Sequence, residues 1–284
     1  MPDVVMYKLI FQNCKFKSSD IEYLCSFLNT THIQKGGLTQ FNLPDKLSQT
    51  DLQDLRKRFA CDVNQLPNHI NIESIKLVVS DMDSTLINIE CIDEIADFAG
   101  VKSKVSEITE AAMQGQLNFE ESLIQRVRLL NGLKVDVLST VYEDRLNLNP
   151  GAEKLIESLQ KQGIKFALVS GGFTYFTKLL QKRLGIDFTL ANELEVVNSK
   201  LNGNIVGDIV GAEAKASFID VTCKKLNIEP VNVVAIGDGA NDLKMMSLAG
   251  LGVAYHAKPT VQEKADCAIN YGGLDGVLGL LGAS

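Results

Sequence analysis

The sequence of 284 residues has no tryptophan, three histidines and no apolar run of 18 or more residues. The missing run argues against a membrane-spanning helix, which needs about 20 apolar residues. The start, MPDVVMYKLI, lacks the basic, apolar and small-residue order of a secretory signal. Because 28 basic residues face 35 acidic ones, the net charge is −7. This balance argues against a nucleic-acid partner bound through a broad basic surface.

Cysteines are few and scattered, and no two of them form a CxxC pair. The six are Cys14, Cys25, Cys61, Cys91, Cys223 and Cys267. Zinc clusters and small secreted disulfide frameworks show other spacings. We therefore expect free, buried thiols and a cytoplasmic protein.

The first quarter of the chain forms one compositional unit. Its patterns predict strands at Val4–Gln12 and Leu38–Leu43 and helices at Asp20–Phe27 and Asp51–Phe59. We interpret residues 1–74 as a small N-terminal α/β domain. No catalytic motif appears in it, so a packing or regulatory role is favoured.

From residue 75 the chain alternates short apolar runs with helical patterns, which predicts a parallel sheet covered by helices on both faces. The expected strands are Ile75–Ser80, Lys165–Ser170, Val231–Gly237 and Gly250–Ala254. The expected helices are Ala152–Gln162, Phe173–Leu184 and Ala214–Leu226. Residues 75–88 and 149–284 therefore form a predicted three-layer α/β/α core. Within it, Glu195–Val210 is expected to be a hairpin that turns at Asn202–Gly203.

One long insertion breaks this alternation. Residues 89–148 are helical in pattern throughout, with expected helices at Cys91–Phe98, Lys104–Gln114, Phe119–Leu130 and Val135–Asp144. Asn118 and Glu121 form a capping-box pattern before the third of these helices. An insertion after the first strand would lie as a cap over the carboxyl edge of the sheet, where ligands bind in open α/β folds.

The first core strand runs directly into Asp81-Met82-Asp83-Ser84-Thr85. Residues two apart on an extended chain face the same way, so both carboxylates would point at one spot. Such a pair favours a hard divalent cation, with Mg²⁺ preferred for oxygen ligands and phosphate chemistry. Taken alone, the triplet is equally compatible with a surface turn.

Two other strand ends carry polar groups. The strand Lys165–Ser170 leads into Ser170-Gly171-Gly172, a turn that can direct a hydroxyl and backbone N–H groups at a phosphate. The strand Val231–Gly237 leads into Asp238-Gly239-Ala240-Asn241-Asp242. Lys215 lies between them at the start of a helix, although a lone lysine is usually a solvated charge.

Taken together and in this order, these segments resemble the four motifs of the haloacid dehalogenase-like phosphatases. Longer segments resemble the phosphoserine phosphatase family in particular: Ile89–Ala96, Ala191–Leu194, Gly207–Val210 and Ala254–Pro259. The resemblance covers roughly Lys76 to Leu281 and leaves out the first 75 residues. Several members of that family carry a regulatory ACT-like fold in their N-terminal region, and the resemblance implies that residues 1–74 are a reduced or divergent version of it.

The resemblance implies a mechanism that the residue types support. Asp81 would be the nucleophile that forms an aspartyl-phosphate. Asp83 would protonate the departing oxygen and then activate water. The implied phosphate-binding groups are Ser170, Gly171, Lys215 and Asn241. The implied Mg²⁺ ligands are Asp81, the backbone carbonyl of Asp83, and Asp238, with Asp242 supporting them nearby.

Substrate selection is expected in the cap. The family pattern places an anion for the substrate ammonium at Glu90 and a cation for its carboxylate at Arg126. The spacing of Phe119, Leu123, Arg126 and Leu130 independently puts Arg126 on one helical stripe. Met113 and Phe119 would wall the pocket. A structural salt bridge for Arg126 and plain packing for these two walls are the alternatives.

The implied reaction is Mg²⁺-dependent hydrolysis of O-phospho-L-serine to L-serine and phosphate, the last step of serine biosynthesis. The expected partner is thus a small-molecule substrate; the sequence gives no oligomeric state and leaves a homodimer open. One alternative is a phosphatase or phosphotransferase of the same superfamily that acts on another small phosphate ester. Another is a non-enzymatic ligand sensor, which the complete catalytic set argues against.

Overall fold

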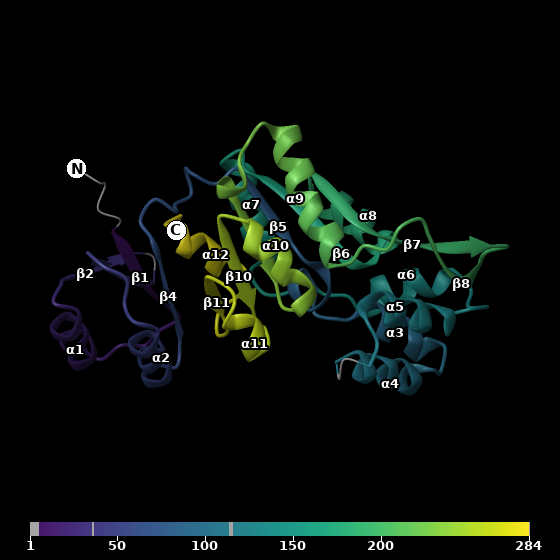
Figure 1. Cartoon of the computed structure of the whole chain (residues 1–284), viewed down its shortest axis with the longest axis horizontal. Helices are drawn as coiled ribbons and strands as arrows, with labels where there is room; N and C mark the ends of the chain where they lie inside the picture. The colour runs from purple at the N-terminus through teal and green to yellow at the C-terminus, as the bar shows by residue number, and fades with distance from the viewer. Residues whose placement is uncertain (1–5, 36, 114–115, 284) are drawn as a thin grey trace.

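The computed structural model describes residues 6–35, 37–113 and 116–283, which build two sheets (Figure 1). The larger sheet has seven strands in the order β11-β10-β9-β5-β6-β7-β8, and the smaller has four in the order β2-β3-β1-β4. In the larger sheet every neighbouring pair is parallel except β7 with β8. Its strands are β5 (Leu77–Ser80), β6 (Lys165–Phe173), β7 (Phe188–Val197), β8 (Lys200–Val206), β9 (Val233–Gly237), β10 (Leu251–Tyr255) and β11 (Cys267–Ile269).

Helices cover both faces of the larger sheet. Alternate residues of the buried strand β5 enter different cores, because successive side chains of a strand point to opposite faces. Val78 packs in one core, and Leu77 and Val79 pack in the other. The first face carries α7 (Ala152–Lys161), α8 (Thr174–Leu184) and α12 (Gly276–Leu280). The second carries α9 (Ala212–Leu226), α10 (Leu243–Leu248) and α11 (Pro259–Gln262). The predicted three-layer α/β/α architecture is confirmed.

The insertion forms a helical cap at the carboxyl end of β5 and β6 (Figure 1). It consists of α3 (Cys91–Phe98), α4 (Lys102–Met113), α5 (Phe119–Arg128) and α6 (Asp136–Asp144). The Asn118 side chain accepts a hydrogen bond from the Glu121 amide, as the capping pattern predicts. The two connections to the core run side by side, since Ile87 pairs with Leu148 in an antiparallel bridge. The side-chain amide of Asn149 links the second connection to the segment after β5 by donating to the carbonyls of Thr85 and Ile87 at 2.8 and 3.0 Å.

The N-terminal segment, residues 6–67, has its own sheet and its own core. Its elements are β1 (Tyr7–Gln12), α1 (Ser18–Leu28), β2 (His32–Lys35), β3 (Leu38–Leu43), α2 (Gln49–Arg58) and β4 (Asp62–Pro67). The two helices pack on one face of this antiparallel sheet around Leu9, Phe11 and Phe41. The sequence patterns missed β2 and β4. Strand β4 was not predicted because Asp62 and Asn64 occupy positions where an alternating pattern would have apolar residues. Their side chains form hydrogen bonds with backbone groups of the core instead.

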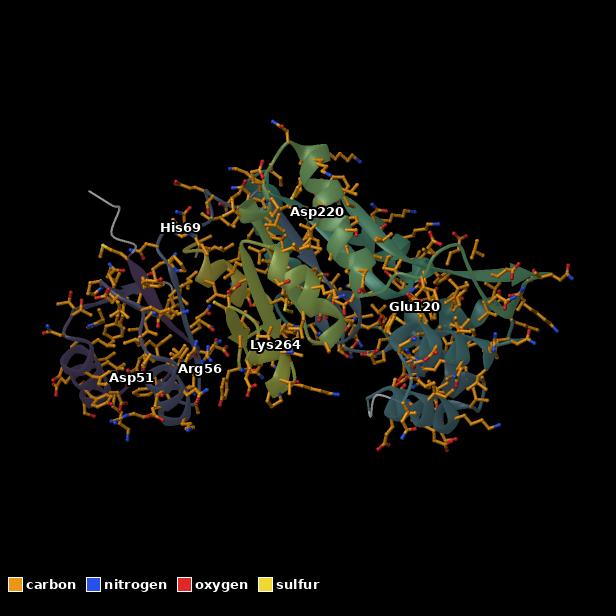
Figure 2. The ribbon with its side chains drawn as sticks, viewed as in Figure 1. Asp51, Arg56, His69, Glu120, Asp220 and Lys264 are labelled. Atoms are coloured by element: carbon orange, nitrogen blue, oxygen red, sulfur yellow. A yellow bond between two sulfur atoms is a disulfide. The ribbon has the colours of Figure 1, made fainter. Side chains whose placement is uncertain are left out.

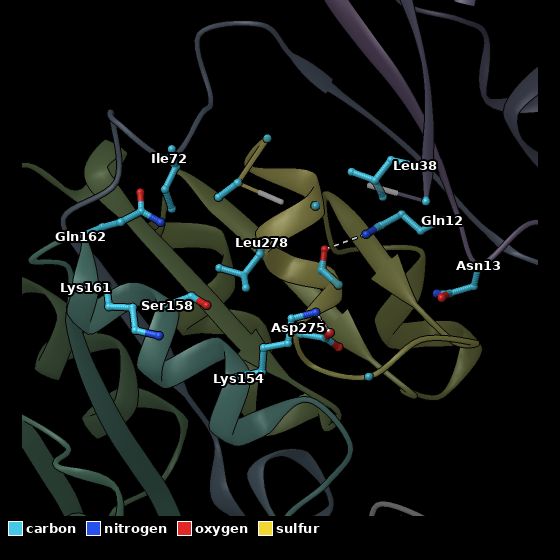
Figure 3. Close-up of a pocket in the computed structure, with 16 residues that line it drawn as sticks. Gln12, Asn13, Leu38, Ile72, Lys154, Ser158, Lys161, Gln162, Asp275 and Leu278 are labelled. Atoms are coloured by element: carbon cyan, nitrogen blue, oxygen red, sulfur yellow. Dashed lines mark hydrogen bonds and ion pairs between the residues drawn. The ribbon is translucent and has the colours of Figure 1, made fainter. Parts of the chain in front are cut away.

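The other face of this sheet docks on the core. The side chain of Asn64 both donates to and accepts from the backbone of Ala268 in β11, each at 2.8 Å. The amide of Gln12 donates to the carbonyl of Gly276 at 2.8 Å (Figure 3). To one side, Arg56 of α2 and Gln262 of the core line one cleft. Figure 2 labels Arg56 on the side of the N-terminal segment that is near the core. The hydrogen bonds of Asn64 and Gln12 fix the orientation of the N-terminal segment on the core.

Two predictions, one about the cysteines and one about a hairpin turn, are wrong. Cys14 and Cys61 form a disulfide instead of remaining free, with Cα atoms 5.1 Å apart. The antiparallel register of β1 and β4 sets Gln12 opposite Asp62, so the cysteines just beyond these positions meet, which a separation of 47 residues conceals. The hairpin of β7 and β8 turns between Val197 and Lys200, where two residues have positive φ, and not at the predicted Asn-Gly.

Candidate active site

The end of β5 delivers Asp81 to the floor of a cavity under the cap. The Asp81 amide donates to the carbonyl of Ile236 at 2.9 Å, so the strand pairing with β9 continues up to this residue. The chain then turns over Met82–Leu86, where Ser84 has a φ of 57°. As a result Asp81 and Asp83 line the same cavity, as their spacing predicts.

Lys215 lies at the centre of the carboxylates. Its ammonium donates to Asp81 Oδ1 and to Asp242 Oδ1, each at 2.7 Å, and its side chain is fully buried. Burial opposes the charged form of Lys215, but the two carboxylates more than offset it, so the pKa of Lys215 lies above its ordinary value. The lysine is therefore a fixed, permanent cation next to the expected nucleophile.

Three carboxylates converge at this edge of the sheet. Asp81, Asp238 and Asp242 each offer an oxygen, and these oxygens lie within 4.8 Å of one another. Thr85 orients Asp238 by donating its hydroxyl to Oδ1 at 3.0 Å. Burial, followed by the charge of the neighbouring Asp242, raises the pKa of Asp238 to about 6. Oxygen donors at this spacing fit a hard divalent cation.

Asp83 is held in a different environment from Asp81. It accepts the Cys91 amide N–H at 2.9 Å and the Ser170 hydroxyl at 3.3 Å. Burial raises the pKa of Asp83, although the Cys91 amide opposes the shift. A carboxyl group whose pKa is raised can carry the proton that a leaving oxygen needs. The Ser170 hydroxyl in turn accepts the Gly172 amide N–H at 2.7 Å, so the turn after β6 is fixed from within.

The cap contributes Glu90, Phe119 and Arg126 to the same cavity. Glu90 accepts the Ser84 hydroxyl at 2.7 Å. Loss of hydration of its carboxyl group, followed by the negative charge of Asp83, raises the pKa of Glu90 to about 8. Arg126 donates from Nε to the carbonyl of Ser122 at 3.3 Å. Burial lowers the pKa of Arg126, and Asp93 and Glu90 oppose that shift. The expected stripe on α5 therefore faces the site.

Cap and core meet closely around this cavity. A side chain at Gly171 would place its Cβ 2.8 Å from the Phe119 ring, so any larger residue there would require the ring to shift. The cavity has a volume of about 170 Å³. This is below the range of about 300–1,000 Å³ typical of drug-sized ligands, which indicates a small substrate.

The structure thus brings together nearly every residue that the sequence singled out. Asn241 lines the cavity beside Asp238, and Lys215 and Asp242 lie buried behind Asp81. Met113 closes α4, but its side chain lies outside the described residues. Neither Asn149 nor Asn192 was predicted as a site residue, although Asn192 lies in the family-like segment Ala191–Leu194. Buried Asn192 donates to the carbonyl of Gly171 and accepts the Val210 amide, both at 2.8 Å, and so supports the turn at Ser170–Gly172.

Comparison with known proteins places the chain. Residues 75–250 match the family model of haloacid dehalogenase-like hydrolases. A phosphoserine phosphatase from Polaromonas is 51% identical over 224 residues, which are 77% of this chain and 95% of that protein. The unliganded crystal structure of a probable phosphoserine phosphatase from Vibrio cholerae is 39% identical, with a TM-score of 0.83 over 98% of this chain and 86% of that one.

A third similar structure holds a reaction-state analogue. It is a phospho-aspartyl intermediate analogue of phosphoserine phosphatase, 41% identical, with a TM-score of 0.69 over 73% of this chain and 99% of that one. The chain therefore belongs to the haloacid dehalogenase-like hydrolases, in the phosphoserine phosphatase family. Enzymes of this class generally use a metal ion, and the acidic triad suited to one is present. Across the described residues, every helix is too short or too polar to cross a bilayer.

Proposed function

We propose that this enzyme hydrolyses O-phospho-L-serine to L-serine and phosphate, the step that completes serine biosynthesis. One observation carries the proposal: a single small cavity is lined by the paired carboxylates Asp81 and Asp83, by Glu90, which is an anion once ionised, and by cationic Arg126. A phosphoserine molecule presents a phosphate, an ammonium and a carboxylate. These residues offer a counterpart to each, and a neutral sugar phosphate would need neither cap charge.

In the proposed reaction, a carboxylate oxygen of Asp81 attacks phosphorus and the bond from phosphorus to the serine oxygen breaks. Asp83 gives its proton to that oxygen, and its raised pKa supports this role. Asp83 then takes a proton from water, which attacks the aspartyl-phosphate and releases the Asp81 carboxylate. Lys215 and the turn at Ser170 and Gly171 stabilise the charge on the phosphoryl oxygens.

A metal belongs at the acidic triad, and we propose Mg²⁺. Asp81, Asp238 and Asp242 would hold it through their side chains, with the backbone carbonyl of Asp83 as a further ligand. Mg²⁺ bound there would reduce the repulsion between the Asp81 carboxylate and the phosphate. Chelation should abolish phosphate release, and added Mg²⁺ should restore it. Activity that persists in excess chelator would contradict this assignment.

Substrate recognition is tested by removing one charge from each side of the contact. Arg126→Met should lower kcat/KM for O-phospho-L-serine by about 10- to 150-fold, the equivalent of a charged hydrogen bond of roughly 1.5–3 kcal/mol. O-phosphoethanolamine lacks the carboxylate, so its slower hydrolysis should change little in this variant. Arg128→Met on the exposed side of α5 is the matched control. Equal losses on both esters would refute the assigned role of Arg126, while Asp81→Asn should abolish both reactions.

The division of the chain follows from the same proposal. Residues 75–88 and 149–284 would form the catalytic core, and residues 89–148 the cap that excludes water. Residues 1–74 would form an ACT-like domain with a role outside catalysis. A homodimer and a cytoplasmic setting belong to the proposal as well, and sedimentation of the purified chain tests the former.

A further inference from the structure

The disulfide of the N-terminal segment occupies a specific place in the fold. Cys14 follows β1 and Cys61 precedes β4, so their bond closes one end of the paired strands β1 and β4. Cys61 is buried, with 4% of its surface exposed, whereas Cys14 is half-buried. The remaining cysteines Cys25, Cys91, Cys223 and Cys267 are free thiols.

The residues next to the two cysteines hold the core. The Asp62 carboxylate accepts three successive backbone N–H groups, from Asn270 at 2.6 Å, Tyr271 at 3.1 Å and Gly272 at 2.9 Å. Asn13 donates to the same carboxylate at 3.2 Å, and its amide comes so close to Gly272 that a Cβ there would clash. Figure 3 shows Asn13 and Gln12 at this end of β1, on the side of the core. The disulfide thus joins the two chain segments that form this docking contact.

The disulfide can also be reached from outside. Cys14 and Cys61 line a surface cavity of about 530 Å³ whose charged residues are Lys15, Arg58 and Asp20. Two cations against one anion favour an anionic reagent in this cavity. They also stabilise a departing thiolate, because cationic neighbours lower the pKa of a thiol.

We propose that the Cys14–Cys61 disulfide is a reversible redox site that exchanges with an anionic low-molecular-weight thiol of the glutathione class, and that its reduction loosens the docking of the N-terminal segment on the core. The thiolate of the small molecule attacks the accessible Cys14 sulfur, the bond between the two protein sulfurs breaks, and Cys61 leaves as a thiolate. A second small thiolate attacks the mixed disulfide on its small-molecule sulfur and releases the Cys14 thiolate. The protein gains two electrons, and two small thiols become one small disulfide.

Counting thiols tests the bond itself. The full-length protein, purified in air and denatured without reductant, should show four reactive thiols and should show six after reduction. Peptide mapping should assign the bond to Cys14 and Cys61. Six thiols in both states, or a bond between other cysteines, would overturn the proposal.

Trapping tests the point of attack and the charge preference. In Cys61→Ser, oxidised glutathione should modify Cys14 at a rate at least tenfold above that of Cys61 in Cys14→Ser, since Cys61 is buried. Lys15→Gln should slow this modification roughly threefold and slow the reaction with uncharged hydroxyethyl disulfide less, because only the charged reagent also loses its attraction to the lysine. Lys17→Gln, on an exposed lysine outside the cavity, is the matched control. Equal rates at the two cysteines would refute access through Cys14. If glutathione disulfide modified Cys14 at the same rate with Lys15 as with Lys15→Gln, the proposed attraction of the anionic reagent by Lys15 would be refuted.

Hydrogen exchange tests the coupling to docking. Reduction of the full chain by glutathione should accelerate exchange of the amides of Asn270, Tyr271 and Gly272 by roughly tenfold, which corresponds to about 1.4 kcal/mol. Cys25→Ser, in the same segment but outside the bond, should respond to reduction as the wild type does. Cys14→Ser should show the faster exchange without any reductant. Unchanged protection of these amides on reduction would show that the bond does not govern docking.

Discussion

Replacing Lys215 by methionine removes the counter-charge of two carboxylates that have no other cation within bonding distance in the described part of the chain. The ammonium lies 2.7 Å from both Asp81 and Asp242, and neither Lys215 nor Asp242 exposes any side-chain surface. Methionine has nearly the same length, so packing is largely kept and the electrostatic contribution is isolated. Removing one partner of a buried ion pair costs about 3–5 kcal/mol. We expect the free energy of unfolding to fall by about that amount.

The loss should also depend on pH in a defined direction. Burial and Asp242 raise the pKa of Asp81 even with the ammonium in place. Without Lys215, the folded protein would hold protons on these carboxyl groups at pH values where the unfolded chain has released them. The folded state then binds more protons, so stability falls as the pH rises, by at most about 1.4 kcal/mol per pH unit and proton. The deficit should be smaller at about pH 5 than at about pH 8.

Urea unfolding followed by circular dichroism measures this effect, with chelator present so that no bound cation replaces the missing charge. Lys178→Met, on the exposed surface of α8, controls for the loss of a lysine as such and should change stability by less than about 0.5 kcal/mol. A loss below about 1 kcal/mol for Lys215→Met, or a loss independent of pH, would refute the buried-pair argument.

Two further predictions concern Glu90, in the cap, and Asn149, in the connection between cap and core. Because the pKa of Glu90 is about 8 and its ionised form would attract the substrate ammonium, kcat/KM for O-phospho-L-serine should fall as the pH drops below about 8. That inflection should vanish in Glu90→Gln, and a pH profile identical to the wild type would contradict the assignment. Asn149→Ala removes donors to the carbonyls of Thr85 and Ile87 and should lower the free energy of unfolding by about 1–3 kcal/mol. Asn147→Ala, on the exposed side of the same connection, should have little effect in the same unfolding experiment.

The core strands and the cap helices could be predicted from the sequence because each buries a periodic apolar face. The predicted α3 agrees with the structure residue for residue, and the predicted α7, α8, β5 and β9 differ by a few residues at their ends. Three core strands, β5, β6 and β9, carry polar side chains at their carboxyl ends, so the convergence of Asp81, Ser170 and Asp238 followed from parallel pairing. The family pattern pointed to Arg126, and helical periodicity independently favoured it over Arg128.

Elements whose stability comes from distant polar contacts could not be predicted in the same way. Strand β4 lacks an apolar alternation because Asp62 and Asn64 bond to backbone groups of residues 268–272. The hairpin turn lies at Asn198 and Ser199 and not at the predicted Asn-Gly pair. Both residues have positive φ, and Val197 pairs with Lys200 on either side of them. Local patterns contain no information about such partners.

The sequence by itself determined the architecture and the cap insertion and singled out the polar groups at the strand ends, since these depend on periodicity and on residue types; the proposed roles of those groups came from the family resemblance. Only the tertiary structure decided how those groups are charged and held: Lys215 between two carboxylates, Asp83 against the Cys91 amide, and Glu90 with a pKa near 8. It also decided that Cys14 meets Cys61. The physical reason is that burial, charge proximity and strand register are properties of distances in space, and residues far apart in the chain set them.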